Sequence, residues 1–225
     1  MTVKDLVRPL PGVRQLSLLR QRVGFRGSAA FWEQNYVRGG TSGTGSYGAL
    51  AEAKAAFLNA FVRVHSVRSV VEFGCGDGHQ LSLADYPRYV GLDVSKAAIQ
   101  MCQRRFAGDS AKSFFLYDGA CFADRAGLFT SDLAISLDVI YHLTEDQVFN
   151  AYLGHLFGAS DRFVVVYATN TEMPGTAPHV RHRRFTRWVN AQCPEWRLTG
   201  VTPGPNPGPG RADFFVYERL TGASR

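Results

Sequence analysis

Three glycines at alternate positions directly follow a short apolar segment, and this junction constrains the fold more than any other feature of the chain. Residues 70–73 form an apolar, β-branched run with no helical period, which predicts a buried strand. Gly74, Gly76 and Gly78 end that strand, because glycine weakens a strand interior but adopts unusual φ angles and lets a ligand approach the backbone. We therefore predict a strand, then a ligand-binding loop, then a helix.

The spacing of the glycines separates this loop from a dinucleotide-binding loop. The dinucleotide fingerprint G-x-G-x-x-G requires glycine at position 79, where the chain has His79. A second apolar run at 89–93 ends in Asp93, and a carboxylate at that place can accept hydrogen bonds from both hydroxyls of a ribose. The two segments together predict a site for a ribose-containing cofactor.

Strands and helices alternate along the rest of the chain. Further strands are predicted at 113–117, 132–137, 162–167, 196–201 and 214–218, and helices at 49–65, 77–84, 95–106, 144–157 and 185–191, with Ser95 and Thr144 as N-caps. This order predicts an α/β fold with a doubly wound, seven-stranded, mostly parallel sheet of Rossmann-like type. Glu72, Asp93, Asp118 and Asp138 all fall at carboxyl ends of predicted strands, so we expect one site at that edge.

The N-terminal part of the chain differs in character from the rest. We predict an N-terminal arm and cofactor lid over residues 1–48, a helical cap, ahead of one domain at 49–225. Aromatic residues at 31–36 and the glycine-rich stretch 39–48 predict a segment that folds over a ligand and excludes water. The arm could also pack on a second subunit, which would make the protein a homodimer.

Charge and cysteine usage bound the partners and the compartment. The formal net charge is +6, with basic residues gathered near the N-terminus and in the segment 179–187. Such clusters favour anionic partners but are also typical of solvated surface. The four cysteines are widely spaced, which predicts reduced thiols. No signal peptide or membrane span is evident in the sequence, so we expect a cytoplasmic protein.

The pattern Glu72-x-Gly74-x-Gly76-x-Gly78, followed by Asp93 after the next strand, resembles motifs I and II of class I S-adenosylmethionine (SAM) dependent methyltransferases. The resemblance implies that the glycines line the methionine part of SAM, Asp93 holds the ribose, and a residue at the end of the fourth strand closes the site beside the sulfonium. The implied cofactor-binding residues are Glu72, Gly74, Gly76, Asp93, Val94, Asp118, Gly119 and Leu137.

The segment after the fourth strand is where we expect a general base. Asp138 and His142 are four residues apart and would share a face of a helical turn, which makes them the candidate catalytic residues. Histidine is the usual base near neutral pH, although His142 could instead only brace the pocket. His179 and His182 are rival bases. Asp138 with a neighbouring carboxylate could also hold a divalent metal such as Mg²⁺, so a metal requirement stays open.

The wider pattern is similar to that of bacterial sugar O-methyltransferases of polysaccharide biosynthesis. The matching stretches are 31–34, 42–48, 72–78, 136–143 and 179–185. This similarity implies a hydroxyl acceptor on a sugar or oligosaccharide, such as the 1-OH of a methylated mannoside. A sugar site needs polar side chains and aromatic faces. The candidate substrate-binding residues are Tyr47, Tyr141, His179, His182 and Arg183.

RNA methylation is the first alternative, ahead of another small-molecule acceptor and of a non-catalytic SAM-binding protein. The basic clusters favour RNA. Ser136-Leu-Asp138-Val stands where base N-methyltransferases of this fold carry an Asn/Asp-Pro-Pro-Tyr motif, which disfavours base methylation. No separate nucleic-acid module is visible, so nucleic acid is the less favoured partner.

Overall fold

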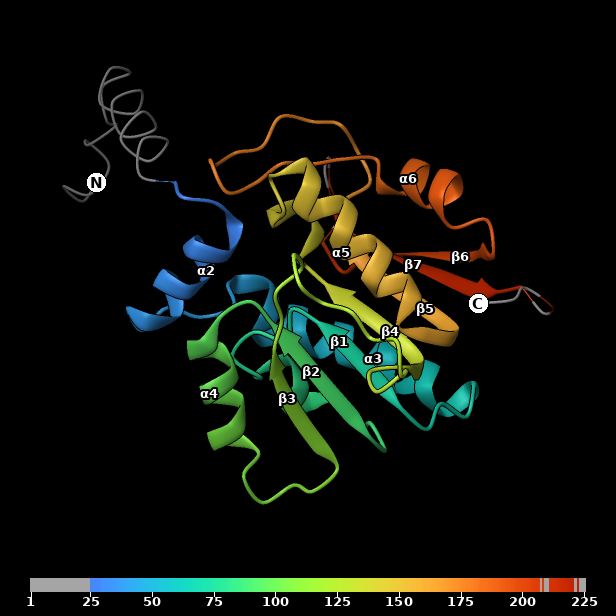
Figure 1. Ribbon diagram of the computed structural model, residues 1–225, viewed down its shortest axis with the longest axis horizontal. Coiled ribbons are helices and arrows are strands. Elements are labelled where there is room, and N and C mark those ends of the chain that lie inside the picture. Colours follow the sequence, from blue (N-terminus) through green and yellow to red (C-terminus); the bar gives the residue numbers. More distant parts are fainter. Residues whose placement is uncertain (1–24, 207, 209–210, 221, 223–225) are drawn as a thin grey trace, which may run out of the picture.

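The computed structural model describes residues 25–206, 208, 211–220 and 222. Its centre is a seven-stranded sheet with strand order β3-β2-β1-β4-β5-β7-β6 (Figure 1). β1 to β5 pair in parallel, and β7 is antiparallel to both of its neighbours. The strands are β1 (Val70–Phe73), β2 (Tyr89–Asp93), β3 (Lys112–Leu116), β4 (Ser131–Leu137), β5 (Ser160–Ala168), β6 (Trp196–Pro203) and β7 (Asp213–Arg219). The predicted doubly wound, mostly parallel sheet is confirmed.

Helices cover both faces of this sheet. They are α2 (Ser28–Val37), α3 (Gly48–Val64), α4 (Lys96–Arg105), α5 (Asp146–Gly158) and α6 (Phe185–Gln192), with 3-10 turns η2 (Thr44–Ser46), η3 (Gln80–Leu83) and η4 (Ile140–His142). Side chains of α3 and α4 pack on one face, and those of α5 and α6 pack on the other. In the described residues no helix has both the length and the apolar character needed to cross a membrane.

Alternate residues of the central strands enter two separate cores. Val70 packs in the cluster that contains Leu58 of α3, whereas Val71 packs in the cluster that contains Leu153 of α5. This division follows from the strand geometry, because successive side chains point to opposite faces. Residues on both faces of β1 are buried, which explains why its sequence is a continuous apolar run interrupted only by Glu72.

Two predicted helix starts differ from the structure. The helix predicted at 77–84 is reduced to the short turn η3, because Gly78 has φ +74°, which a right-handed helix does not contain. Thr144 does not cap α5, which begins at Asp146 with Glu145 at the N-cap position. The Thr144 hydroxyl donates to the Glu145 carboxylate instead (3.1 Å).

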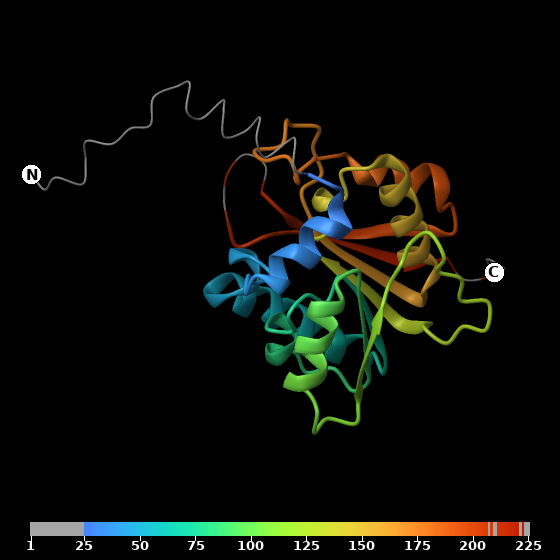
Figure 2. The same ribbon diagram turned by 60° about the vertical axis from the view of Figure 1, so that its left-hand side comes forward.

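Residues 25–47, which we call the strap, cross the carboxyl end of the sheet. Figure 2 shows α2 lying over the strand ends beside α4. This is the helical cap predicted from the aromatic residues 31–36. The predicted arm, with its predicted contact to a second subunit, falls on residues 1–24 and lies outside the described residues.

Candidate functional site

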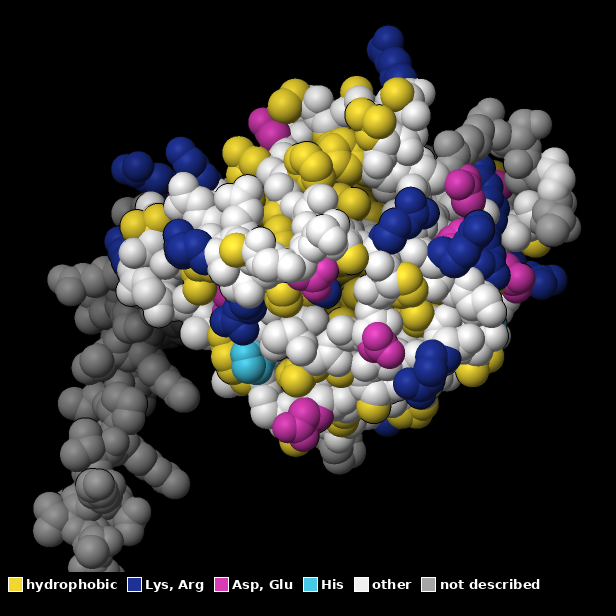
Figure 3. Space-filling model, turned by 90° about the horizontal axis from the view of Figure 1, so that it is seen from below, with side chains coloured by type: hydrophobic (Ala, Val, Ile, Leu, Met, Phe, Trp, Pro, Cys, Tyr) yellow, Lys and Arg dark blue, Asp and Glu magenta, His cyan; other side chains and the backbone are white. Residues whose placement is uncertain are grey.

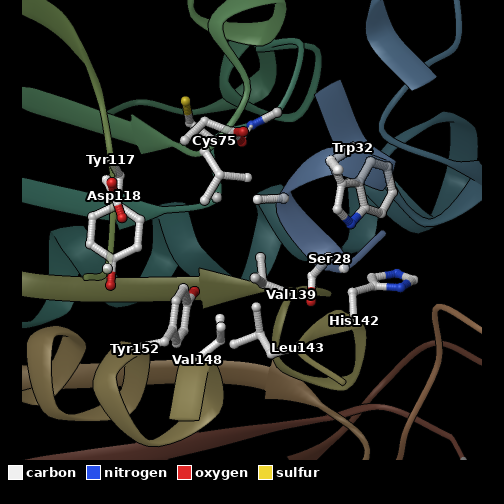
Figure 4. Close-up of a pocket in the computed structure, with 18 of the residues that line it drawn as sticks. Ser28, Trp32, Cys75, Tyr117, Asp118, Val139, His142, Leu143, Val148 and Tyr152 are labelled. Atoms are coloured by element: carbon white, nitrogen blue, oxygen red, sulfur yellow. Dashed lines mark hydrogen bonds between the residues drawn. The ribbon is translucent and has the colours of Figure 1, made fainter. Parts of the chain in front are cut away.

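A cavity of about 650 Å³ lies at the carboxyl end of the sheet, where the strand order reverses between β1 and β4. Open α/β sheets bind their ligands at such a switch point. All the residues predicted to hold the cofactor line this cavity, namely Glu72, Gly74, Gly76, Asp93, Val94, Asp118, Gly119 and Leu137. Figure 4 shows Tyr117 and Asp118 at one end of it and Trp32 and His142 at the other. The topology thus brings these residues together, and cofactor binding by them stays a prediction.

The glycine loop approaches neighbouring segments too closely to carry side chains. The φ angle is +86° at Gly74 and +58° at Gly76, in the left-handed region that favours glycine. A Cβ atom at Gly74 would lie 2.4 Å from Cγ2 of Val139, and one at Gly76 would lie 2.3 Å from Oγ of Ser42. The bare backbone therefore forms a cradle at the cavity wall, which fits the methionine end of SAM.

Two buried carboxyl groups flank this cradle. Asp93 accepts hydrogen bonds from the backbone N–H groups of Gly76 (2.9 Å) and Ser95 (2.8 Å). Burial raises the pKa of the Asp93 carboxyl to about 6, so it is ionised at neutral pH and can accept from ribose hydroxyls. Glu72 accepts from the Tyr89 hydroxyl (2.5 Å), and burial raises the pKa of its carboxyl to about 7. The donor and acceptor chemistry of this wall fits SAM.

Two carboxylates, one of them on the strap itself, join the strap to both sides of the cavity. Glu145, at the start of α5, accepts hydrogen bonds from the backbone N–H (2.9 Å) and the hydroxyl of Ser28. Glu33 of the strap reaches the other way and accepts from the Ser95 hydroxyl (2.6 Å) at the start of α4. The strap is therefore tied to both sides of the sheet's carboxyl end.

A third carboxylate, Asp77, holds the glycine-rich part of the strap. It accepts from the backbone N–H of Ser42 (2.9 Å) and from the Tyr47 hydroxyl (2.7 Å). Although burial opposes it, hydrogen bonding from Tyr47, His79 and Ser42 lowers the pKa of the Asp77 carboxyl. The Tyr47 ring also stacks on His79, with ring centroids 4.1 Å apart. Tyr47, predicted to bind substrate, thus fastens the loop and does not line the cavity.

Asp138 and His142 do not share a helical face, contrary to the sequence prediction. Asp138 has φ +60°, which breaks the backbone before the 3-10 turn η4 begins. Its carboxylate accepts from the Lys54 ammonium (2.6 Å) and from the Tyr141 hydroxyl (2.8 Å). Asp138 is therefore half of an ion pair with a buried lysine, which is a poor arrangement for a general base. Tyr141, predicted to bind substrate, is engaged by the same carboxylate.

His142 lines the cavity and is chemically suited to accept a proton. Its Nδ1 lies 3.0 Å from the carbonyl oxygen of His179. A carbonyl only accepts, so Nδ1 carries the hydrogen and Nε2 carries the lone pair. The edge of the imidazole meets Trp32, with ring centroids 4.9 Å apart. Burial lowers the pKa of His142 to about 4, so the ring is neutral at physiological pH.

The other predicted substrate residues lie behind His142 and outside the cavity lining. The His179 ring stacks on Phe31 of the strap, with centroids 4.1 Å apart. His182 shares a 2.7 Å hydrogen bond with the Thr169 hydroxyl. Arg183 donates to backbone carbonyls at 143 and 144 and to the Asp146 carboxylate (3.0 Å). The guanidinium of Arg183 thus attaches the segment before α6 to the start of α5.

Replacing Arg183 with alanine tests this structural role. The change removes the side-chain donor of the Leu143 carbonyl and leaves the Thr144 carbonyl with Arg181 alone, so we expect the free energy of unfolding to fall by about 2 kcal/mol. Arg187→Ala is the matched control, because the Arg187 pair with Glu172 is exposed on both sides and should contribute less than about 0.5 kcal/mol. Urea denaturation measures both. Unchanged stability together with a raised KM for the acceptor would instead assign Arg183 to substrate binding.

The Mg²⁺ site left open at Asp138 has no matching ligand set in the described part of the chain. No group of three or more His, Cys, Asp and Glu side chains is placed there to hold a metal ion. The carboxylate of Asp138 already has the Lys54 ammonium as its cationic partner. The residues present do not fit a divalent metal.

Comparison with solved structures places this geometry among known folds. The N-methyltransferase NodS of Bradyrhizobium japonicum, in complex with S-adenosyl-l-homocysteine, has a TM-score of 0.66 and 14% identity over 87% of this chain and 99% of that chain. The methyltransferase domain of bacterial CtHen1 has a TM-score of 0.60 and 20% identity over 75% of this chain and 98% of that domain. The magnesium protoporphyrin IX methyltransferase of Synechocystis PCC 6803, with bound SAM, has a TM-score of 0.57 and 16% identity over 91% of each chain.

The chain has the fold of class I SAM-dependent methyltransferases. No family model matches it. A region of 109 residues is 30% identical to a small RNA 2'-O-methyltransferase of Arabidopsis thaliana, and covers 44% of this chain but only 12% of the plant protein. These similar proteins differ in the atom and the molecule that they methylate, so the class I fold does not specify the acceptor.

Sequence reasoning missed Lys54, which had a visible signal. Lys54 lies on the same face of α3 as Ala51, Ala55 and Leu58, all of which are buried. A lysine in the apolar stripe of an amphipathic helix predicts a buried partner of opposite charge. The partner itself, Asp138, lies 84 residues away in the sequence and could not have been identified from that stripe.

Proposed function

We propose that the protein is a SAM-dependent O-methyltransferase, with the strap as a lid over its cofactor. The cavity at the switch point supports this proposal most strongly, because it joins a bare glycine cradle, the ionised carboxylate of Asp93 and a neutral His142 in one enclosure. Gly74 and Gly76 would hold the methionine end of SAM, Asp93 the ribose, and Asp118 with Gly119 the adenine. Bound SAM supplies a methyl group already activated on a sulfonium sulfur.

His142 would act as the base for a hydroxyl acceptor. A hydroxyl has a high pKa and gains from a base in the transition state. The acceptor oxygen forms its bond to the methyl carbon while the carbon–sulfur bond breaks, with the electron pair left on sulfur. The hydroxyl proton passes to Nε2 of His142, whose ring is held in the correct tautomer by the carbonyl of His179. The residues around it mainly supply alignment and exclude water.

The surroundings of His142 support an uncharged sugar hydroxyl as the acceptor. Trp32 lines the cavity and supplies an aromatic ring beside His142, as sugar sites require. Three arginines of the segment 179–187 pair with acidic side chains of this chain: Arg181 and Arg183 with Asp146, and Arg187 with Glu172. Figure 3 shows the side of the molecule away from the segment before α6, and there Lys and Arg side chains mostly lie apart and are interspersed with Asp and Glu. That face offers no continuous basic surface for a phosphate backbone.

The 2'-hydroxyl of RNA is the second candidate acceptor. The curated plant relative acts on small RNA, and it methylates a ribose hydroxyl, which is chemically close to a hydroxyl of an oligosaccharide. A neutral base facing a sugar ring would serve both. For the oligosaccharide class, the 1-OH of a methylated mannoside is the acceptor that we propose to test first.

Methyl transfer from labelled SAM decides between these acceptors. Wild-type protein and Gly76→Val, which fills the cradle, are incubated with neutral mannose oligosaccharides and separately with small RNA. We expect label in the oligosaccharide with the wild type and none with Gly76→Val. Label in RNA alone would replace the oligosaccharide with RNA as the substrate. Absence of SAM binding by the wild type would overturn the proposed function.

A further inference from the structure

Lys54 is an unusual residue for the middle of an apolar helix face. Only 1% of its surface is exposed, and its ammonium lies 2.6 Å from Oδ2 of Asp138. The ammonium also lies over the Tyr167 ring, 5.3 Å from the centroid. An ammonium buried in this way must be paired, and an apolar side chain of similar size often serves stability equally well. The pair therefore calls for an explanation beyond packing.

The ion pair is connected to His142 by a continuous set of contacts. Asp138 is held on three sides: its two carboxylate oxygens accept from Lys54 and Tyr141, and its backbone N–H donates to the carbonyl of Tyr167 (2.9 Å). Tyr141 lies in η4, the turn that also carries His142, and the two rings are in contact with centroids 4.6 Å apart. The backbone of Asp138 is in the left-handed region, with φ +60°, and a residue other than glycine keeps that conformation only when its surroundings hold it.

The pair also sets the charge near the imidazole. Asp138 and Tyr141 face His142 from its own segment, and His179 and His182 face it from the segment before α6. The strap contributes the uncharged Trp32. Asp138 is thus the anionic group among these neighbours, and Lys54 is its counter-ion.

We propose that Lys54 is a positioning residue for the methyl transfer: its ammonium fixes Asp138, and thereby the η4 turn that carries His142, and it offsets the charge of Asp138. This inference rests on the proposed function. Lys54 touches neither cofactor nor acceptor, and it acts through Asp138 and Tyr141. Without its charge, Asp138 would lose one of its anchors, and its uncompensated carboxylate would raise the pKa of His142.

Lys54→Met keeps the length of the side chain and removes its charge. We expect kcat to fall about 10- to 100-fold, with the affinity for S-adenosylhomocysteine unchanged and the acid limb of the pH–rate profile moved upward. An NMR titration should show the same upward shift in the pKa of His142. The double variant Lys54→Met with Asp138→Asn removes both charges, so it should return the titration of His142 toward the wild-type position.

Lys112→Met is the matched control. Lys112 is also largely covered and paired with an aspartate, Asp109, but it lies at the amino end of β3, away from the cavity. Lys112→Met should leave the titration of His142 unchanged. A wild-type titration of His142 in Lys54→Met would overturn the proposal. If Lys54→Met does not fold, Asp138→Asn replaces it, and we expect the pKa of His142 to be lower in that variant than in the wild type. An unchanged pKa of His142 in Asp138→Asn would then overturn the proposal. The titration needs no acceptor, so it stays readable even if the wild type transfers no methyl group.

Discussion

Replacing Asp93 with alanine is expected to weaken SAM binding by at least about 100-fold, or ~3 kcal/mol. The change removes the carboxylate proposed to accept from the ribose, and it also frees the backbone N–H of Gly76 that orients the glycine cradle. Isothermal titration calorimetry with S-adenosylhomocysteine measures the loss. Asp85→Ala, at an exposed carboxylate, is the control and should bind as the wild type does.

The pH dependence of binding tests the same carboxylate in the wild type. Burial raises the pKa of Asp93 to about 6, so the group is increasingly protonated as the pH falls below that value. A protonated carboxyl can no longer accept from both ribose hydroxyls. We therefore expect the affinity for S-adenosylhomocysteine to fall below about pH 6, by up to about tenfold per pH unit.

Full affinity in folded Asp93→Ala would contradict the assignment of Asp93 to the ribose.

Replacing His142 with glutamine is expected to lower kcat by about 100- to 10,000-fold while leaving cofactor affinity unchanged. Glutamine can still donate to the carbonyl of His179, but it has no basic nitrogen to take the hydroxyl proton. Single-turnover transfer from labelled SAM measures the effect. In the wild type, the rate should not vary with protonation of His142 across the neutral range, because burial lowers its pKa to about 4.

His65→Gln serves as the control for this variant. His65 follows the end of α3 and packs on Phe61 and on Phe163 near the amino end of β5, whereas the cavity lies at the carboxyl end of the sheet. The His65→Gln variant should transfer methyl groups at the wild-type rate. Near-normal kcat in His142→Gln would mean that His142 braces the pocket and that the acceptor needs no base from this residue.

Local physical signals made most of the fold predictable from the sequence. All seven strands lie where the apolar runs predicted them, and the signal is strongest in β1, β4 and β5, which bury both faces. Ser95 caps α4 as predicted, with its hydroxyl accepting from the N–H of Ala98 (3.1 Å). The gathering of the residues predicted to bind the cofactor also followed from topology alone, since parallel strands end at one edge.

The sequence did not reveal contacts that depend on tertiary distance. Four-residue spacing suggested a shared face for Asp138 and His142, but spacing has that meaning only on an α-helix, and the backbone breaks at Asp138. The bond between Ser28 and Glu145 joins residues 117 positions apart, so no local pattern predicts it. Arg183 was predicted to bind substrate because it stands in a basic run. The arginines of such a run can face the solvent or bind other parts of the chain, and only the packing of the folded protein distinguishes the two.

A crystal structure of the complex with S-adenosylhomocysteine tests the central claim most directly. The account predicts the amino-acid end along Gly74 and Gly76, the ribose hydroxyls on Asp93 and the adenine beside Asp118. It also predicts that the sulfur faces the end of the cavity where Nε2 of His142 lies. A ligand bound elsewhere, or a sulfur turned away from His142, would contradict the account.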